Sequence, residues 1–207
     1  MIKRLKDKLT SIMEEEEQKI ILMEAGGGNE PDLRVVGLFS EIVDEKIAEI
    51  IHAMLFMNEM NKAEKDEKKK KDIEFYLSTY GGSADDMFAL YDMMKHIQKE
   101  TDISVIGMGK VMSAGVLILA GGTKGKRKIG RNCRIMLHSV IAGNQGSLHN
   151  LVNEMEAIQD LQEMYIDRLV EETKLSKKQL KKMLEQKVNI YLSAEQAVEH
   201  GIADEII

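Results

Sequence analysis

The chain has 207 residues, 43% of them hydrophobic and 31% charged, a composition typical of one soluble globular domain with a core of its own. No uninterrupted apolar run approaches the roughly 20 residues that a membrane span requires, and a net charge of -6 argues against a general nucleic-acid binder. The single cysteine, Cys133, excludes an intramolecular disulfide and a cysteine-rich metal site, so we expect it to be a packing residue.

The N-terminal segment differs in composition from the rest of the chain. Apolar residues recur at helical spacing over residues 2–13, and an acidic block and the glycine-rich run Gly26–Pro31 follow. We expect residues 1–32 to form an amphipathic, flexible segment that contacts a partner, and residues 33–207 to form a single domain. The segment has neither the apolar centre of a signal peptide nor the acid-poor composition of a transit peptide, so the expected location is the cytoplasm.

The first half of the domain contains two predicted strand-helix pairs. Alternating apolar residues predict the strands, and apolar residues at helical spacing predict the helices; Gly81 and Gly82 break the second strand, and Ser83 can cap the helix after it. The almost entirely charged run of residues 61–72 predicts an exposed connection. The expected elements are strands at residues 33–39 and 73–77 and helices at residues 44–57 and 83–96.

The second half repeats the strand-turn-helix pattern and then adds a long helix. The pattern predicts a turn at Lys110, a helix beginning at Ser113, and capping boxes at Ser176 and Ser193, with Gly201 closing the last helix. Repeated units of this kind imply an α/β fold. The remaining expected elements are strands at residues 103–107 and 134–140 and an amphipathic helix at about residues 148–172, whose wide apolar stripe needs a partner surface.

Ser113 and His138 are the candidate catalytic residues. Ser113 begins an apolar helix, where the positive end of the helix dipole stabilises developing negative charge, and His138 lies near the end of a predicted strand, where it could act as a general base. Each residue also has an ordinary structural explanation. The run Met112–Gly115 lacks the leading glycine of a nucleophile elbow, and a histidine in an apolar strand is more often a core residue. Gly81 and Gly82 could likewise form only a turn.

Nothing in the sequence indicates a cofactor or a metal. The run Gly122–Arg127 lacks the spacer and the final Ser or Thr of a phosphate-binding loop, and the five histidines show no short metal-ligand spacing. We therefore expect any ATP to be used by a partner. The basic clusters Lys68–Lys71 and Lys124–Lys128 are predicted to be solvated loops rather than a nucleic-acid site.

From about Val35 to Ile206 the chain resembles the proteolytic subunit of the Clp protease, a serine peptidase of the crotonase-like superfamily. Five landmarks occur in the order that this family shows. They are the Gly81–Ser83 turn, the Ser113 helix, the run Ala120–Arg127, the run Arg134–His138 and the run Leu192–Asp204.

The resemblance implies a role for each site residue. It implies Ser113 as the nucleophile and His138 as the general base, with the backbone N–H groups of Gly82 and Ala114 as the oxyanion hole. The chain departs from the family at Asn189, which occupies the position of the expected aspartate. An asparagine carbonyl can still accept a hydrogen bond from the histidine, but it stabilises the imidazolium less than a carboxylate does. The sequence thus predicts a weakened Ser-His-Asn triad.

The resemblance also implies an assembly. The helix at residues 148–172 corresponds to the family's handle, which interdigitates between two stacked seven-subunit rings, and an AAA+ unfoldase would feed unfolded polypeptides into the chamber, with residues 1–32 near the axial opening or a partner. Lys187–Val188 replaces the acid-arginine pair that usually couples the two rings. Two other hypotheses are a noncatalytic, regulatory subunit of a mixed ring, favoured by Asn189, and another crotonase-like protein such as a capsid-maturation peptidase or an acyl-CoA enzyme.

Overall fold

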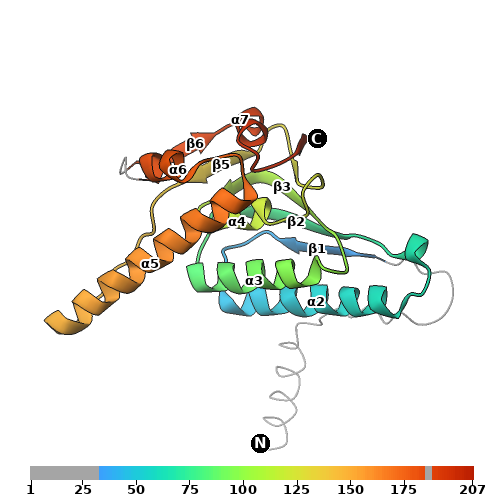
Figure 1. Ribbon diagram of the computed structural model, residues 1–207, viewed down its shortest axis with the longest axis horizontal. Coiled ribbons are helices and arrows are strands. Elements are labelled where there is room, and N and C mark those ends of the chain that lie inside the picture. The colour runs from blue at the N-terminus through green and yellow to red at the C-terminus, as the bar shows by residue number, and fades with distance from the viewer. Residues whose placement is uncertain (1–32, 185–187) are drawn as a thin grey trace, which may run out of the picture. The chain divides into compact units, whose positions relative to one another are not determined.

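The computed structural model describes residues 33–184 and 188–207, which form an α/β fold around one seven-stranded sheet (Figure 1). The N-terminal segment of residues 1–32 and Lys187 lie outside the described residues. The strands are β1 (Val35–Leu38), β2 (Ile73–Thr79), β3 (Ile103–Met112), β4 (Lys128–Ile129), β5 (Arg134–Leu137), β6 (Ile190–Leu192) and β7 (Glu205–Ile206). The helices are α2 (Asp44–Ala63), the short 3-10 helix η1 (Glu67–Lys69), α3 (Ala84–Ile97), α4 (Ala114–Ala120), α5 (Leu148–Glu172), α6 (Lys177–Leu184) and α7 (Ala194–Glu199).

The sheet divides at β3. Strands β1, β2 and β3 run parallel; the middle of β3 then pairs with β4, and its last residues, Lys110 to Met112, pair with β5. Strand β4 continues to β7, whereas β5 continues to β6, the one antiparallel neighbour among the described strands. Because parallel strands end at the same edge of a sheet, the residues that follow β2, β3 and β5 are brought together there.

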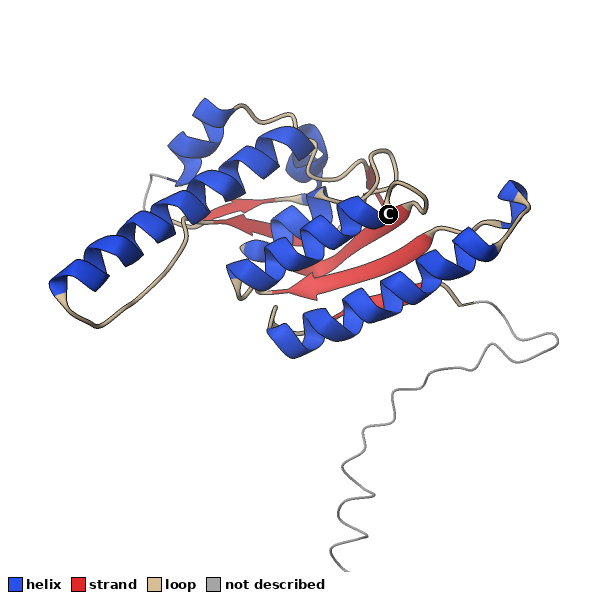
Figure 2. Ribbon diagram, turned by 60° about the horizontal axis from the view of Figure 1, so that its bottom comes forward, coloured by secondary structure: helices blue, strands red, loops and turns tan. Residues whose placement is uncertain are grey.

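Helices cover the sheet according to their apolar faces. Helices α2 and α3 run side by side along β1, β2 and β3 in both views (Figures 1 and 2), and α3 turns its residues Met87, Leu90 and Met94 into the core. All seven residues of α4 are buried, as expected of a helix that is apolar all round. Cys133 is also buried, which raises the pKa of its thiol to about 11. Among the described residues, no helix is both long enough and apolar enough to cross a bilayer.

The predicted helix ends agree with the observed caps. Ser83 accepts a hydrogen bond from the Asp86 amide, and both capping boxes form, between Ser176 and Gln179 and between Ser193 and Gln196. Gly201 follows α7 with φ 73°, a conformation that favours glycine. Helix α5 has the predicted bounds. Its first residues extend away from the sheet in Figure 1, and its last turns pack against α4.

Two predicted boundaries in the second half are wrong. The turn expected at Lys110 is absent, because β3 continues to Met112 through Gly109, whose φ of 66° lets the strand bend. The strand expected at residues 134–140 ends at Leu137, where its pairing with β6 stops. His138 therefore follows the strand.

The prediction that the exposed connection begins at residue 61 is also wrong. Helix α2 extends to Ala63, and Asn61 is only 2% exposed. Its side chain accepts a hydrogen bond from Arg34 and donates to the carbonyl of Lys71 and the hydroxyl of Thr101. A polar side chain in a charged run can be buried in this way because hydrogen bonds satisfy its amide group.

The basic run Lys124–Lys128 is not a solvated loop throughout, contrary to the prediction. Arg127 is only 4% exposed, and its Nε donates to Asp204 at 2.8 Å. A second guanidinium nitrogen donates to the backbone carbonyls of Ala120 and Glu172. A buried guanidinium is stable here because a carboxylate and two carbonyls satisfy its donors.

Candidate active site

Ser113 lies at a sharp turn between β3 and α4. Its backbone has φ 55° and ψ -126°, and it is the only non-glycine residue with positive φ in the described part of the chain. Its amide donates to the Met136 carbonyl at 2.8 Å, which ties the turn to β5. This strained strand-turn-helix geometry is that of a nucleophile elbow, although the sequence lacks the elbow's leading glycine.

The glycine pair before α3 is required by close packing against this turn. A side chain at Gly81 would place its Cβ 2.6 Å from the Cβ of Ser113, and one at Gly82 would collide with the backbone of Ile42. Their φ values of 104° and 152° are also ones that other residues rarely adopt. The pair is therefore more than a turn, because it allows the backbone after β2 to approach Ser113.

His138 is in hydrogen-bond contact with Ser113. Its Nε2 lies 2.8 Å from the Ser113 Oγ, and both side chains are partly buried. The two residues follow β5 and β3, which pair as far as Met112 and Met136, so the sheet places both at one edge. This distance is within the range that a general base needs to remove a proton from a serine hydroxyl.

Two backbone amides border the same cavity as this pair. In residues 33–184 and 188–207, neither the N–H of Gly82 nor that of Ala114 donates a hydrogen bond to another residue, whereas the amides on either side of Gly82, those of Gly81 and Ser83, both do. Unused amides beside a nucleophile can stabilise an oxyanion. The cavity has a volume of about 370 Å³, and its lining includes Gly82, Met87, Phe88, Ser113, Ala114 and His138.

Asn189 precedes β6 at the end of the ladder that His138 follows, and among the described residues it makes no hydrogen bond to His138. Strands β5 and β6 are antiparallel, and Leu137 and Ile190 are their last pair. Asn189 is exposed, and between described residues no hydrogen bond joins it to the imidazole. The sequence predicts Asn189 as the third residue of the triad, and the structure records no hydrogen bond between Asn189 and His138 among the described residues.

Tyr165 belongs to the apolar stripe predicted for the helix at residues 148–172, and the sequence indicates no role for it beyond packing. In the structure, its hydroxyl donates to the backbone carbonyl of Ser113 at 3.0 Å, from the buried part of α5. Burial raises the pKa of Tyr165, so the hydroxyl stays protonated and remains a donor. The one sequence signal for this hydrogen bond is a phenol within an otherwise apolar stripe, and that signal does not show which group accepts the bond.

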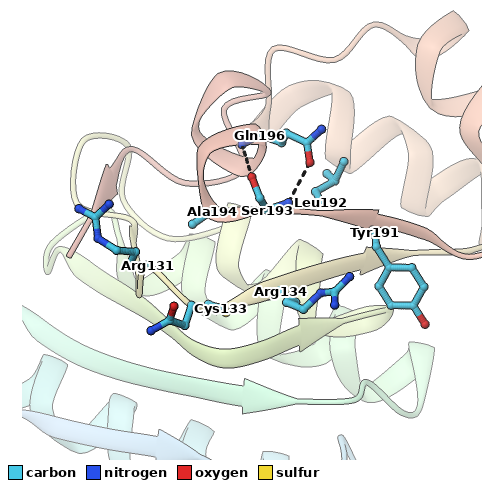
Figure 3. A pocket seen from close by; sticks show the side chains of 9 residues that line it. Arg131, Cys133, Arg134, Tyr191, Leu192, Ser193, Ala194 and Gln196 are labelled. Carbon is cyan, nitrogen blue, oxygen red and sulfur yellow. Dashed lines mark hydrogen bonds between the residues drawn. The ribbon is translucent and has the colours of Figure 1, made fainter.

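A second hollow, also of about 370 Å³, lies between β5, β6 and the start of α7 (Figure 3). The Arg134 guanidinium lies 5.2 Å from the centre of the Tyr191 ring. The serine of this hollow, Ser193, is engaged with Gln196 in the helix cap, as the dashed lines in Figure 3 show. Among the described residues, no group of three or more His, Cys, Asp or Glu is placed to hold a metal ion. The arrangement suited to acyl transfer is therefore the Ser113 cavity.

Comparison with known proteins gives a consistent result. Residues 31–207 match the model of the Clp protease family. The chain is 30% identical over 174 residues to an ATP-dependent Clp protease proteolytic subunit of Mesostigma viride, covering 84% of this chain and 71% of that protein. It is 29% identical over 199 residues to proteolytic subunit 1 of Prochlorococcus marinus subsp. pastoris, covering 90% and 94%. Together with the α/β fold and the order of the site residues, these matches show that the chain belongs to the Clp protease family.

Proposed function

We propose that the chain is a catalytic Clp-type subunit that hydrolyses peptide bonds of unfolded polypeptides at Ser113. The observation that carries this proposal is the 2.8 Å contact between the Ser113 Oγ and the His138 Nε2 at a strained elbow. Packing alone does not explain a hydrogen bond between a histidine and a serine that is held at positive φ. Strain of this kind persists when the surrounding structure imposes it, and it is concentrated at functional sites.

The proposed reaction follows from this geometry. His138 takes the Ser113 proton as the hydroxyl attacks the substrate carbonyl, and the resulting tetrahedral oxyanion accepts hydrogen bonds from the amides of Gly82 and Ala114. His138 then gives the proton to the leaving amine, and a water molecule hydrolyses the acyl-enzyme by the same steps. Each amide of such a pair is worth about 2.7–4 kcal/mol of transition-state stabilisation.

Asn189 is the proposed third residue. Its support is the β5–β6 ladder, whose last pair, Leu137 and Ile190, is followed by His138 on one strand and preceded by Asn189 on the other. In the proposed triad the Asn189 carbonyl oxygen accepts a hydrogen bond from the imidazole Nδ1–H. An amide can orient the ring in this way, but it stabilises the imidazolium less than a carboxylate does. We therefore expect turnover by this triad to be slow.

The relatives' names extend the proposal to an assembly. They are named as subunits of an ATP-dependent protease, and we infer for this chain stacked seven-subunit rings that enclose the site and receive substrate from an ATP-driven AAA+ unfoldase in the cytoplasm. Helix α5 supports the association, because Leu148, Val152 and Met155 are exposed by 73%, 49% and 57%. Sedimentation of only monomers at micromolar concentration would contradict this assembly.

A second candidate function is that of a noncatalytic subunit in a mixed ring. The observation that favours it is Asn189, an exposed amide that makes no hydrogen bond with His138 in the described structure. In this case the chain would contribute α5 to assembly, and Ser113 would not react.

Labelling with a fluorophosphonate, which reacts with activated serines, separates the two candidates. The catalytic proposal predicts labelling that Ser113→Ala and His138→Ala both abolish. Ser147→Ala is the matched control, because Ser147 is exposed and makes no side-chain cap hydrogen bond at α5; this variant should label as the unaltered protein does. No labelling of a correctly assembled oligomer would favour the noncatalytic subunit.

A further inference from the structure

The peptide unit between Ser113 and Ala114 is held at one end and unused at the other. Its carbonyl oxygen accepts hydrogen bonds from the Tyr165 hydroxyl and from the Val116 amide, both at 3.0 Å. Its N–H, which belongs to Ala114, donates to no other residue of the described chain. The same N–H is the one that the proposed reaction assigns to the oxyanion.

The direction of this N–H is set by the carbonyl. A trans peptide is planar, so its C=O and N–H point in opposite directions and rotate together as one rigid unit. A donor that fixes the oxygen of Ser113 therefore also aims the amide of Ala114. Hydrogen bonds in a chain polarise one another, so a donor on the oxygen also strengthens the N–H as a donor in turn.

Tyr165 suits this task because it is buried and comes from another element. It lies in α5, 52 residues after Ser113, is only 6% exposed, and packs in the part of α5 that contacts α4. The second donor, Val116, is one turn along the same short helix and moves with it. Tyr165 is thus the contact that fixes the peptide relative to the rest of the protein.

We propose that Tyr165 is a positioning residue that holds the Ser113–Ala114 peptide so that the Ala114 amide faces the oxyanion. Tyr165 acts through the peptide and touches no reacting atom. The inference rests on the proposed function for its effect on catalysis, but the peptide orientation itself can be measured without turnover.

The test uses Tyr165→Phe, which removes only the hydroxyl, in the full chain. We expect kcat for an unstructured peptide to fall about 10- to 100-fold. Displacing an oxyanion donor such as the Ala114 amide by about 1 Å or less has effects of this order. We expect KM to change by less than about twofold, since the bond affects the transition state rather than the bound substrate. Tyr76→Phe is the matched control, because its hydroxyl donates an exposed hydrogen bond to Glu74; this variant should retain the original kcat.

A resonance of the Ala114 amide gives the second readout. Labelling with carbonyl-13C serine and 15N alanine selects the three Ser-Ala pairs of the chain, whose amides belong to Ala84, Ala114 and Ala194. Tyr165→Phe should shift the Ala114 resonance and leave the other two in place, because it removes the hydroxyl and keeps the ring. Cooperative unfolding of each variant confirms that it is folded.

The outcomes separate the two proposals. An unmoved Ala114 resonance, or an unchanged kcat in folded Tyr165→Phe, overturns the positioning role. The proposed function would be overturned instead if the unaltered protein hydrolysed no peptide, or if Ser113→Ala left its hydrolysis unchanged. In that case the resonance alone decides whether Tyr165 holds the peptide.

Discussion

Leu137 and Ile190 form the last pair of the antiparallel β5–β6 ladder, so His138 follows one strand and Asn189 precedes the other at the same end of the ladder. The ladder thus brings these two residues to the same end of β5 and β6, and Asn189 is an exposed amide there. In the proposed triad, Asn189 provides an amide where a carboxylate would stabilise the imidazolium. A single substitution can therefore separate the contribution of the charge from that of the geometry.

Asn189→Asp is expected to raise peptide turnover. A carboxylate beside the imidazole stabilises the positive charge that forms when His138 takes the serine proton, and the reverse change in a serine-protease triad lowers the rate by about 10⁴. The gain should appear in kcat, measured with an unstructured peptide at neutral pH. Asn132→Asp adds the same charge at an exposed position of the turn between β4 and β5 and should have no effect. If Asn189→Asp gives no gain, another carboxylate serves His138 or the site is not catalytic.

Ser113→Gly is expected to be more stable than Ser113→Ala. Both variants lose the hydroxyl, but glycine adopts φ 55° without the strain of about 1–3 kcal/mol that a Cβ incurs there. Glycine also gains about 0.4–1 kcal/mol of conformational entropy in the unfolded chain, so the net difference should be about 1 kcal/mol.

Urea unfolding at one protein concentration measures this difference. Ser139 serves as the control position, because it lies outside the positive-φ region. The order should reverse there, with the alanine variant more stable than the glycine variant. Equal or greater stability of Ser113→Ala would show that the elbow is not strained.

The ion pair of Arg127 and Asp204 is expected to make stability depend on pH. Burial opposes ionisation of Asp204, but hydrogen bonds and charge from Arg127, with the amides of Arg127 and Gly125, outweigh it and lower the pKa of the carboxyl. Because the pKa is lower in the folded state than in the unfolded chain, the resulting stabilisation is present above the unfolded value, near pH 4. It is lost as the pH falls through the folded value.

Asp204→Asn should therefore destabilise the protein at pH 7 by about 3 kcal/mol, since it leaves the buried guanidinium without its carboxylate. The difference from the unaltered protein should narrow at pH 3, measured by urea unfolding at both pH values. Asp92→Asn, at an exposed position of α3, should cost little at either pH. A difference that stays constant between pH 7 and pH 3 would contradict the assigned pKa shift.

The strand-helix units could be predicted because their signals are local. Alternation over β2, the serine cap of α3 and the stripe of α5 each lie within one element, and the structure places those elements where the pattern indicates. The partners of Arg127 and Tyr165 are 77 and 52 residues away in the chain. The basic composition around Arg127 predicted a solvated loop, but it could not show that Lys128 begins β4 or that a distant carboxylate permits the burial of Arg127.

The candidate site divides in the same way. Ser113 and His138 could be proposed from their order along the chain and from the helix that starts at Ser113, and the α/β fold explains why they meet. The strained elbow at Ser113 could not be predicted, because its strain is imposed by β3, β5 and the glycine pair rather than by a local motif. Tyr165 was predicted only as a core residue, since the helical stripe is equally well formed by apolar residues that donate no hydrogen bond.

Asn61→Ala is expected to lower the free energy of unfolding by about 3 kcal/mol. The Asn61 amide joins the end of α2 to Arg34, Lys71 and Thr101, so its removal leaves buried donors and acceptors with fewer partners, at about 1–3 kcal/mol for each unsatisfied group. Urea unfolding followed by circular dichroism measures the loss.

The control for this prediction is another helical asparagine. Asn153 is exposed on α5, and Asn153→Ala should change the free energy of unfolding by less than about 0.5 kcal/mol. Asn61→Asp tests the same site with the shape kept, and it should lose stability too, because a carboxylate has no N–H to donate to Lys71 and Thr101. Similar losses for Asn61→Ala and Asn153→Ala would show that the charged run is as solvated as its composition suggests, and that the buried amide contributes no specific stabilisation.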